Sequence, residues 1–268
     1  MGGSVSSSWL CATFGVEQPL IGMVHLQPLP GSPCFAGDFD AVIDAALRDA
    51  EALAQGGFDG CIVENFGDVP FFPDRVPEVT VAAMAVVTDR LVRATRLPVG
   101  VNVLRNDAMA ALSVAAVVGA SFIRVNVLAG AMVTDQGLIQ GRAHEVMRAR
   151  AALGAKVMVL ADVLVKHAVP LGEADPVRQA ADLLERAGAD GLIVTGRATG
   201  EAPSPAKVQQ LRQAFPGATI LVGSGVSPSN APHFLPFCDG FIVGTWLKSG
   251  RGVSVERVRE FVSAVRGT

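Results

Sequence analysis

Short runs rich in Val, Ile and Leu alternate with longer helical patterns along almost the whole chain, and this alternation occurs eight times. The apolar runs are predicted strands over residues 20–26, 60–65, 98–104, 121–128, 156–163, 191–196, 219–225 and 240–245. Predicted helices cover residues 40–55, 80–95, 107–118, 142–153, 175–187, 204–215 and 254–265, and a shorter one covers 229–237. Strands this continuously apolar indicate a parallel sheet that is covered by helices.

Eight strand–helix units close most economically into one (β/α)8 barrel, and 268 residues is a common length for that fold. We therefore predict an α/β chain with a single parallel eight-stranded TIM barrel over residues 19–268. Residues 1–18 lack the basic start and the apolar stretch of a signal peptide, and they are expected to be a disordered or loosely packed tail. An open doubly wound sheet is the alternative, but the GxGxxG motif that would follow its first strand is absent.

Composition and charge exclude several classes of protein. Half of the residues are hydrophobic and 18% are charged, which allows an extensive buried core. A net charge of −3 without a basic stripe argues against a nucleic-acid partner. The longest uncharged run, residues 108–123, is short for a membrane span, so no integral membrane segment is expected. The four cysteines lack CxxC spacing and indicate reduced thiols in a cytoplasmic protein. Assembly into a homo-oligomer is left open.

Polar side chains stand near the C-terminal end of nearly every predicted strand, which is where barrels of this type place their active sites. These candidates are His25, Glu64, Asn65, Asn102, Arg124, Asn126, Asp162, Thr195, Ser224 and Thr245. Arg124 and Asp162 carry most weight, because charged side chains are rarely buried unless they are paired. A purely structural ion pair of Arg124 with Asp162 or Glu64 is the alternative interpretation.

The seventh and eighth predicted strands both end in glycine-containing turns, GSGVSPSN over 223–230 and GTWLK over 244–248. Glycine lets backbone N–H groups approach a ligand, and a helix that starts after Pro228 would point its positive end at an anion. Phosphate sites of barrels are built from these two loops. We therefore predict a phosphate site, with ordinary turns as the alternative, formed by Gly223, Ser224, Gly225, Gly244 and Thr245.

Two further loops carry groups with possible chemical roles. Lys166 and His167 follow the fifth predicted strand and are candidates for a general acid, a general base or, for the lysine, an imine-forming amine. A solvated lysine and a helix-capping histidine are the alternative. Arg197, in the loop after the sixth strand, is expected to reach a second anionic group. Glu64 and Asp162 would hold a divalent metal ion, but no HxH or HExxH spacing supports a metal, and no cofactor is assigned.

Several segments together resemble the BtpA/SgcQ family over about residues 20–265. They are GMVHLQPLPGSP (22–33), DGCIVENFGDVPF (59–71), RVNVLAGAMVTDQGLIQG (124–141), ADVLVKHAVPL (161–171), VTGRATG (194–200) and GSGVSPSN followed by DGFIVGTWLKSG (223–230 and 239–250). The resemblance implies similarity to the phosphate-binding TIM barrels. The family takes its name from a cyanobacterial factor needed for photosystem I accumulation, and another branch lies among sugar-metabolism genes and carries a nucleoside-triphosphatase label.

Three functions are compatible with these observations. The first is an enzyme that performs acid–base isomerase or lyase chemistry on a small phosphorylated metabolite, a sugar phosphate or a nucleotide-like compound. Catalysis is assigned to Asp162, Glu64, His25, His167 and Lys166, and substrate binding to Asn65, Asn102, Arg124, Asn126, Thr195 and Arg197. The second is a metal-dependent phosphohydrolase or nucleoside triphosphatase, and the third is a non-catalytic assembly or stability factor. The buried charges favour an enzyme, because a mere binding platform has no reason to bear their desolvation cost.

Overall fold

A computed structural model describes residues 6–172 and 174–267, and its main sheet is a closed barrel of parallel strands. The barrel strands are β1 (Leu20–His25), β2 (Gly60–Glu64), β3 (Val99–Asn102), β4 (Phe122–Val125), β7 (Met158–Val163), β9 (Gly191–Val194), β10 (Ile220–Val222) and β11 (Phe241–Val243). They follow one another around the barrel in chain order, and β11 closes it by pairing with β1. The predicted TIM barrel and its eight strands are confirmed.

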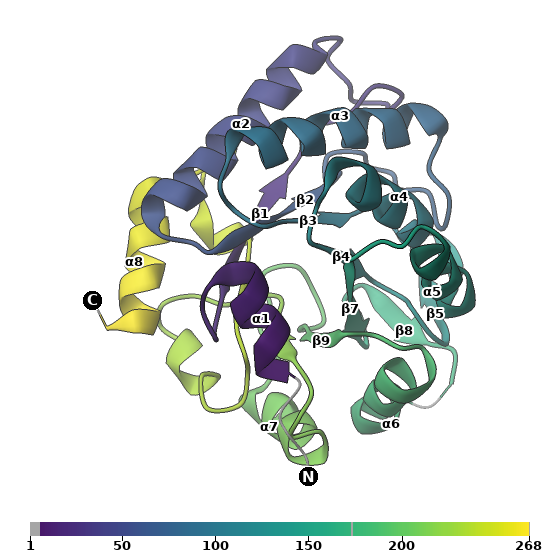
Figure 1. Ribbon diagram of the computed structural model, residues 1–268, viewed down its shortest axis with the longest axis vertical. Helices are drawn as coiled ribbons and strands as arrows, with labels where there is room; N and C mark the ends of the chain where they lie inside the picture. Colours follow the sequence, from purple (N-terminus) through teal and green to yellow (C-terminus); the bar gives the residue numbers. More distant parts are fainter. Residues whose placement is uncertain (1–5, 173, 268) are drawn as a thin grey trace.

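Helices surround this barrel (Figure 1). They are α2 (Phe39–Gly56), α3 (Glu78–Ala94), α4 (Ala108–Val118), α5 (Ala143–Ala152), α6 (Pro176–Ala181), α7 (Pro205–Ala214) and α8 (Val255–Arg266). Local chemistry sets their starts, because side chains cap the first turn of α2, α4, α6, α7 and α8 through Asp38, Asp107, Asp175, Ser204 and Ser254. The predicted helix over 175–187 is present as α6 followed by a π-helical segment, Asp182–Arg186.

The predicted short helix over 229–237 is wrong in its extent. The structure has a 3₁₀ turn over Ala231–His233, and ordinary turns lie on either side of it. Pro232 and Pro236 have no N–H to donate to a helical hydrogen bond, which explains why a regular helix does not form. This segment therefore does not supply the helix N-terminus that the sequence suggested as an anion site.

Side chains alternate strictly between the inside and the outside of the barrel. Outward residues such as Val63, Val101 and Val159 pack against the helices in the larger hydrophobic core. Inward residues form a separate apolar cluster that fills the barrel, and it includes Ile21, Met23, Ile62, Phe122, Leu160, Ile193, Leu221 and Ile242. Every second side chain continues to point inward beyond this cluster, up to the C-terminal end of each strand. This alternation determines which side chains line the barrel mouth.

Helix α1 (Ser6–Phe14) closes the opposite end of the barrel, and Figure 1 shows it lying across the centre of the ring. Leu10 and Phe14 are buried in the inward cluster, where the Phe14 ring lies 5.8 Å from that of Phe122. The Trp9 Nε1 donates a hydrogen bond of 3.0 Å to the Thr219 hydroxyl. Residues 1–5 lie outside the described part of the chain. Residues 1–18 were expected to be a disordered or loosely packed tail because they lack a basic start and a sustained apolar stretch, and the packing of α1 differs from that expectation over Ser6–Phe14.

A three-stranded antiparallel sheet beside the mouth was not predicted. It consists of β6 (Gly137–Gln140), β5 (Ala131–Thr134) and β8 (Ala168–Pro170). Met132 and Ile139 pack beneath it on Val127 and Val165. The turn between β5 and β6 ends at Gly137, whose φ of 98° favours glycine, so the DQG sequence was the one available signal. A second small hairpin pairs β12 (Lys248–Ser249) with β13 (Gly252–Val253).

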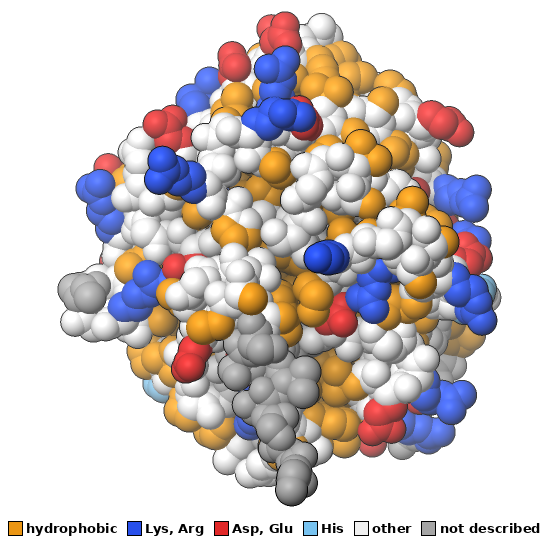
Figure 2. All heavy atoms as spheres, viewed as in Figure 1, with side chains coloured by type: hydrophobic (Ala, Val, Ile, Leu, Met, Phe, Trp, Pro, Cys, Tyr) orange, Lys and Arg blue, Asp and Glu red, His pale blue; other side chains and the backbone are white. Residues whose placement is uncertain are grey.

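On the face seen in Figure 2, basic and acidic side chains are intermixed around the rim and do not gather into one basic patch. Among the described residues, no helix combines the length and the apolar character needed to cross a bilayer.

The packing of α1 predicts a measurable contribution to stability. Leu10→Ala removes a side chain that is 1% exposed, and we expect a loss of about 2–4 kcal/mol in the free energy of unfolding by urea. Cys11→Ala, on the exposed side of the same helix, is the control and should change this free energy little. Equal effects of the two substitutions would contradict the packing of α1 against the barrel interior.

Candidate active site

The inward side chains at the C-terminal ends of the strands form a polar ring above the apolar filling. In strand order this ring comprises His25, Glu64, Asn102, Arg124, Asp162, Thr195, Gly223 and Gly244. His25, Glu64 and Asn102 are in register on three neighbouring strands, so they lie at the same height. The ring thus contains six of the ten strand-end candidates named from the sequence, and Asn65, Asn126, Ser224 and Thr245 lie outside it.

A buried ion pair occupies the centre of the ring. Arg124 Nη2 lies 3.1 Å from Asp162 Oδ2, and the two side chains are 3% and 0% exposed. Asn126 Nδ2 donates a 2.7 Å hydrogen bond to the same carboxylate oxygen, and Asn102 Nδ2 donates to the Arg124 carbonyl at 2.9 Å. Asp162 is therefore held by a guanidinium and an amide. These bonds fix the orientation of its carboxyl group.

Glu64 has a different environment from Asp162. Its nearest ionisable contact is His25, with 3.6 Å between Glu64 Oε1 and His25 Nε2. Burial raises the pKa of Glu64, and the charge of Asp162 adds to this, although Arg124 and Lys166 act in the opposite direction. A buried carboxyl group with a raised pKa is suited to exchange a proton with a ligand.

His25 is a neutral imidazole in this site. Burial lowers its pKa from 6.5 to about 3, and the positive charges of Lys248, Lys166 and Arg124 contribute to the lowering. Its ring stacks on that of Phe66, with 4.4 Å between the centroids. A neutral, stacked His25 beside Glu64 can relay or accept a hydrogen bond, but the charged imidazolium is disfavoured there.

A cavity of about 370 Å³ opens beside the ion pair, which is a volume suited to a small metabolite. One wall is apolar and comes from Phe66, Val69, Phe71 and Leu104. The other is polar and comes from Glu64, Arg105, Arg124, Asn126, Asp135, Lys166, His167 and Thr199. Five of the residues proposed from sequence, Glu64, Arg124, Asn126, Lys166 and His167, therefore share one cavity.

Two cationic residues of the mouth were missed by the sequence reasoning. Arg105 is buried in the loop after β3, and its Nη2 donates a 2.6 Å hydrogen bond to the Lys166 carbonyl. Lys207 lies in the first turn of α7, and its Nζ is 3.4 Å from the Thr195 carbonyl oxygen. Burial lowers the pKa of Lys207, and the charge of Asp162 opposes this effect. Neither residue lies on a barrel strand, so a search of strand ends could not find them.

Burial lowers the pKa of Lys166, and the charges of Arg124 and Arg105 lower it further against the opposing effect of Glu64 and Asp162. Among the described residues, the Lys166 ammonium has no hydrogen-bond or ion-pair partner. The same loop places Leu164 and His167 at φ values of 52° and 54°. Left-handed conformations of such residues are costly and concentrate at functional sites.

His167 and Arg197 join the loops after β7 and β9. The backbone N–H of Thr199 donates to His167 Nε2 at 3.1 Å, and the backbone N–H of His167 donates to the Arg197 carbonyl at 3.0 Å. The Arg197 side chain is exposed and does not line the cavity. The structure thus leaves Arg197 at the rim, where its proposed role toward a second anionic group stays a prediction.

Asn65 serves mainly to shape the wall of the mouth. Its side-chain oxygen accepts a 2.7 Å hydrogen bond from the Leu104 N–H, and its Nδ2 lies 3.2 Å from Asp68 Oδ2. These bonds fix the loop that precedes Arg105. The predicted role of Asn65 in substrate binding is untested, and its contacts point to positioning.

The predicted phosphate loops lie next to one another but are partly covered. The Ser224 hydroxyl accepts a 2.8 Å hydrogen bond from the Gly196 N–H and donates one of 2.8 Å to the Glu201 carbonyl. A Cβ at Gly225 would come within 2.1 Å of the Ala202 nitrogen, so the loop after β9 packs directly on this turn. Gly223 and Gly244 face the barrel interior, and Thr245 is exposed. A Cβ at Gly223 would come within 2.3 Å of Ile193 Cγ2, and one at Gly244 within 3.1 Å of His25 Cε1, so both glycines let neighbouring side chains pack on the backbone.

The donor set does not favour a metal centre. Within residues 6–172 and 174–267, no three His, Cys, Asp or Glu side chains converge as potential metal ligands. Asp162, one of the two residues considered, is already engaged with Arg124 and Asn126. The pair Glu64 and Asp162 thus fits a divalent ion poorly.

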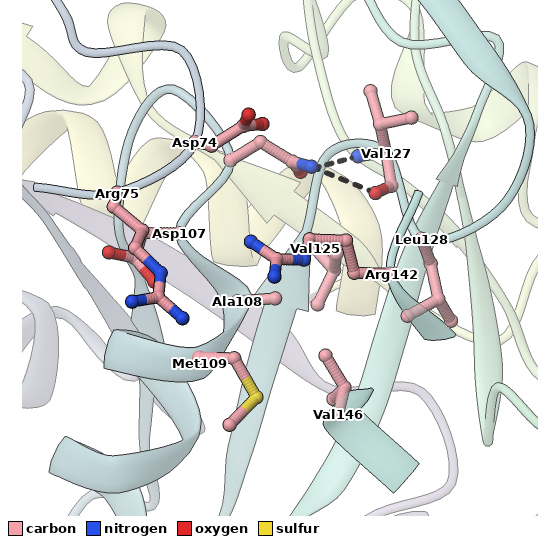
Figure 3. Close-up of a pocket in the computed structure, with 11 residues that line it drawn as sticks. Asp74, Arg75, Asp107, Ala108, Met109, Val125, Val127, Leu128, Arg142 and Val146 are labelled. Atoms are coloured by element: carbon pink, nitrogen blue, oxygen red, sulfur yellow. Dashed lines mark hydrogen bonds between the residues drawn. The ribbon is translucent and has the colours of Figure 1, made fainter. Parts of the chain in front are cut away.

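A second crevice, between the starts of α4 and α5, is too small for a substrate (Figure 3). It holds about 10 Å³, room for roughly one water molecule. The side chains of Arg75 and Arg142 point toward it. Dashed lines in Figure 3 mark the two hydrogen bonds of 2.9 and 2.8 Å between the Asn106 amide and the Val127 backbone. These bonds brace the loop that carries Arg105.

The depressed pKa of His25 predicts an acid-sensitive contribution to stability. The unfolded chain protonates this residue below pH 6.5, whereas the folded chain resists protonation down to about pH 3. The neutral imidazole thus stabilises the fold above pH 6.5, and acidification from pH 7 to pH 5 should remove about 2 kcal/mol of this contribution.

We expect His25→Gln to lose less stability than the wild type between these two pH values, as measured by urea unfolding. His233→Gln, which removes an exposed histidine, is the control. Parallel pH profiles of wild type and His25→Gln would contradict the neutral buried state.

Comparisons with known proteins agree with this architecture. The model of the BtpA family matches residues 16–267. An uncharacterized protein of Thermococcus kodakarensis is 50% identical over 93% of this chain and 96% of its own length. The photosystem I biogenesis protein BtpA of Synechocystis is 46% identical over 96% of this chain and 91% of its own length.

Similar solved structures share the barrel at low sequence identity. A GGGPS structure from Thermoplasma volcanium has a TM-score of 0.63 at 14% identity, and 99% of each chain is covered. A native KDPGal structure has a TM-score of 0.61 at 18% identity, with coverage of 95% of this chain and 98% of that one. These likenesses show the TIM-barrel fold, and the match of the family model and of the relatives shows that this chain belongs to the BtpA family.

Proposed function

We propose that the chain is an enzyme that acts on a small phosphorylated metabolite by acid–base isomerase or lyase chemistry. The observation that carries the proposal is the charge balance inside the mouth. Four cationic side chains, Arg105, Arg124, Lys166 and Lys207, face two buried carboxyl groups, Glu64 and Asp162. The Arg124–Asp162 pair largely cancels, and the charges of Arg105 and Lys207 then favour an anionic ligand.

The phosphate group is assigned to the ends of β9, β10 and β11. Gly223 and Gly244 have no side chain on the inner wall there, where Ile193 and Met23 pack closely on their backbone, and Lys207 supplies a positive charge next to Thr195. The Thr195 hydroxyl is buried and has no hydrogen-bond partner among the described residues, so it is available to a ligand oxygen. Ser224, Gly225 and Thr245 support the surrounding loops.

The reacting part of the substrate is assigned to the cavity beside the ion pair. Glu64 is the proton donor or acceptor, and His25 shares a proton or a hydrogen bond with it. Asp162 holds Arg124 and Asn126 in place, and these two groups stabilise negative charge that develops on the substrate. Two carboxyl groups with different surroundings in one mouth are the arrangement that divides acid from base roles.

The other functions have less support in the structure. A metal-dependent phosphohydrolase needs a convergent set of ligands, and Asp162 is engaged elsewhere. A role in photosystem I biogenesis is known from the name of the Synechocystis relative, and it does not exclude catalysis by the same barrel. A non-catalytic factor would tolerate Glu64→Gln, because that substitution keeps the size and polarity of the side chain.

Ligand-induced stabilisation tests the proposal. In a thermal-unfolding screen of phosphorylated metabolites, a true ligand at about 100 times its Kd should stabilise the fold by about 2.7 kcal/mol. Lys207→Met should abolish most of this stabilisation, whereas Lys156→Met, an exposed lysine at the other end of the barrel, should leave it intact. The absence of stabilisation by every phosphorylated compound, with the unphosphorylated counterparts as controls, would count against the proposal.

The roles of the two carboxyl groups are separable in the same assay. Glu64→Gln should retain stabilisation by the ligand and lose turnover, because it removes the exchangeable proton and keeps the shape of the site. Asp162→Asn should also lower the stability of the free protein, because it leaves the buried Arg124 without a charged partner, and we expect a cost of about 3–5 kcal/mol. Full activity of Glu64→Gln would refute its assignment as the proton carrier.

A further inference from the structure

The distribution of lysine in this chain is unusual. Only four of its 22 basic residues are lysines, namely Lys156, Lys166, Lys207 and Lys248, and all others are arginines. Lys166, Lys207 and Lys248 surround the barrel mouth, since all three lie after the barrel strands on the loops or helix starts of that end. Arginine cannot lose its proton in a protein, whereas lysine can. The mouth therefore holds most of the amines in the chain that are able to act as nucleophiles.

The three lysines of the mouth differ in their partners. Lys248 forms an ion pair with Asp49 at 3.3 Å, and Lys207 is directed to the Thr195 carbonyl at 3.4 Å. Lys166 lines the cavity and has no such partner among the described residues. Its backbone is held by the hydrogen bond from Arg105 to the Lys166 carbonyl, so the position of the loop does not depend on the ammonium group.

The surroundings of Lys166 favour the free amine. Burial and two nearby guanidinium groups, those of Arg124 and Arg105, lower its pKa. Lysines are activated as nucleophiles in this way, by desolvation and by neighbouring cations. Phe66, Val69, Phe71 and Leu104 add apolar side chains to the lining of the same cavity.

We infer that the ε-amine of Lys166 forms an imine with the carbonyl group of the substrate, which makes the substrate a phosphorylated aldehyde or ketone. The phosphate part of this inference rests on the proposed function, whereas imine formation itself does not. An imine draws electrons from the neighbouring bonds, which suits the cleavage or migration of a bond next to the former carbonyl carbon.

The step balances with the groups that line the cavity. The amine nitrogen attacks the carbonyl carbon, and one N–H proton is transferred to the oxygen as the hydroxyl of a carbinolamine forms. The protonated Glu64 then gives a proton to this hydroxyl, which leaves as water while the C=N bond forms. The imine nitrogen keeps its second proton as an iminium cation, which draws electrons from the neighbouring bonds, and the Glu64 carboxylate balances its charge. One water is released per imine, and nothing is oxidised or reduced.

Reductive trapping tests this inference directly. The chain is incubated at pH 7 with pyridoxal 5′-phosphate or with pyridoxal, reduced with borohydride and mapped by peptide mass spectrometry. Because the chain has four lysines, each site is read separately, and exposed Lys156 is an internal control. We expect the label at Lys166 at roughly ten times the extent at Lys156, because more of the buried amine is unprotonated. Lys166→Arg should remove this label and keep the fold, as judged by circular dichroism.

The two aldehydes separate the inference from the proposed function. Faster labelling of Lys166 by the phosphorylated aldehyde than by pyridoxal, with the difference lost in Lys207→Met, would support both. Equal labelling of Lys166 by the two aldehydes would support the imine and contradict the phosphate site. Labelling mainly at any other lysine, or none at Lys166 with either aldehyde, would overturn the inference even if phosphorylated metabolites stabilise the wild-type protein. Because the wild-type map alone decides this point, failure of a variant to fold does not affect it.

Discussion

The ion pair between Arg124 and Asp162 organises the barrel mouth. Two charges this deeply buried are tolerated only when they are paired and hydrogen-bonded, and Asn126 and Asn102 complete that requirement. The pair joins β4 to β7, which are neighbours in the barrel. Since Asp162 is committed to Arg124, the second carboxyl group, Glu64, is left with a neutral histidine and little solvent. The difference between the two carboxyl groups thus follows from one interaction.

In the proposed function, phosphate recognition and proton transfer occupy different parts of this mouth. Glycines and Lys207 lie at the ends of β9 to β11, whereas Glu64, Lys166 and the cavity lie around β2, β4 and β7. A substrate that spans the ion pair would be held at one end and react at the other. Binding energy from the phosphate end then serves to position the reacting end, which is how small phosphorylated substrates are activated in general.

The alternation of inward and outward side chains along each strand explains why much of the candidate site was predictable. Once a barrel is expected, the inward residue at each strand end is determined by the two-residue period, and this rule yields His25, Glu64, Asn102, Arg124, Asp162 and Thr195. The resemblance to the BtpA family also came from motifs at these strand ends. This alternation therefore predicts position well, although it says nothing about which partner each polar group takes.

Residues outside the strands could not be predicted in the same way. Arg105 and Lys207 reach the mouth from a loop and from a helix start, and their directions depend on tertiary contacts that no local pattern reveals. The same holds for α1, which is stabilised by the open end of the barrel rather than by its own periodicity. The loop after β9 covers Ser224 and Gly225, and this contact also depends on tertiary packing that the local sequence does not reveal.

The central claim is that an anionic metabolite binds at the barrel mouth with its reacting end beside Glu64. A crystal structure determined with a phosphorylated compound that stabilises the protein tests it most directly. The account predicts the phosphate within hydrogen-bond distance of Lys207 and Thr195, and the remainder of the ligand in the cavity between Glu64 and Lys166. A stabilising ligand found elsewhere on the molecule, with the mouth occupied by solvent alone, would contradict it.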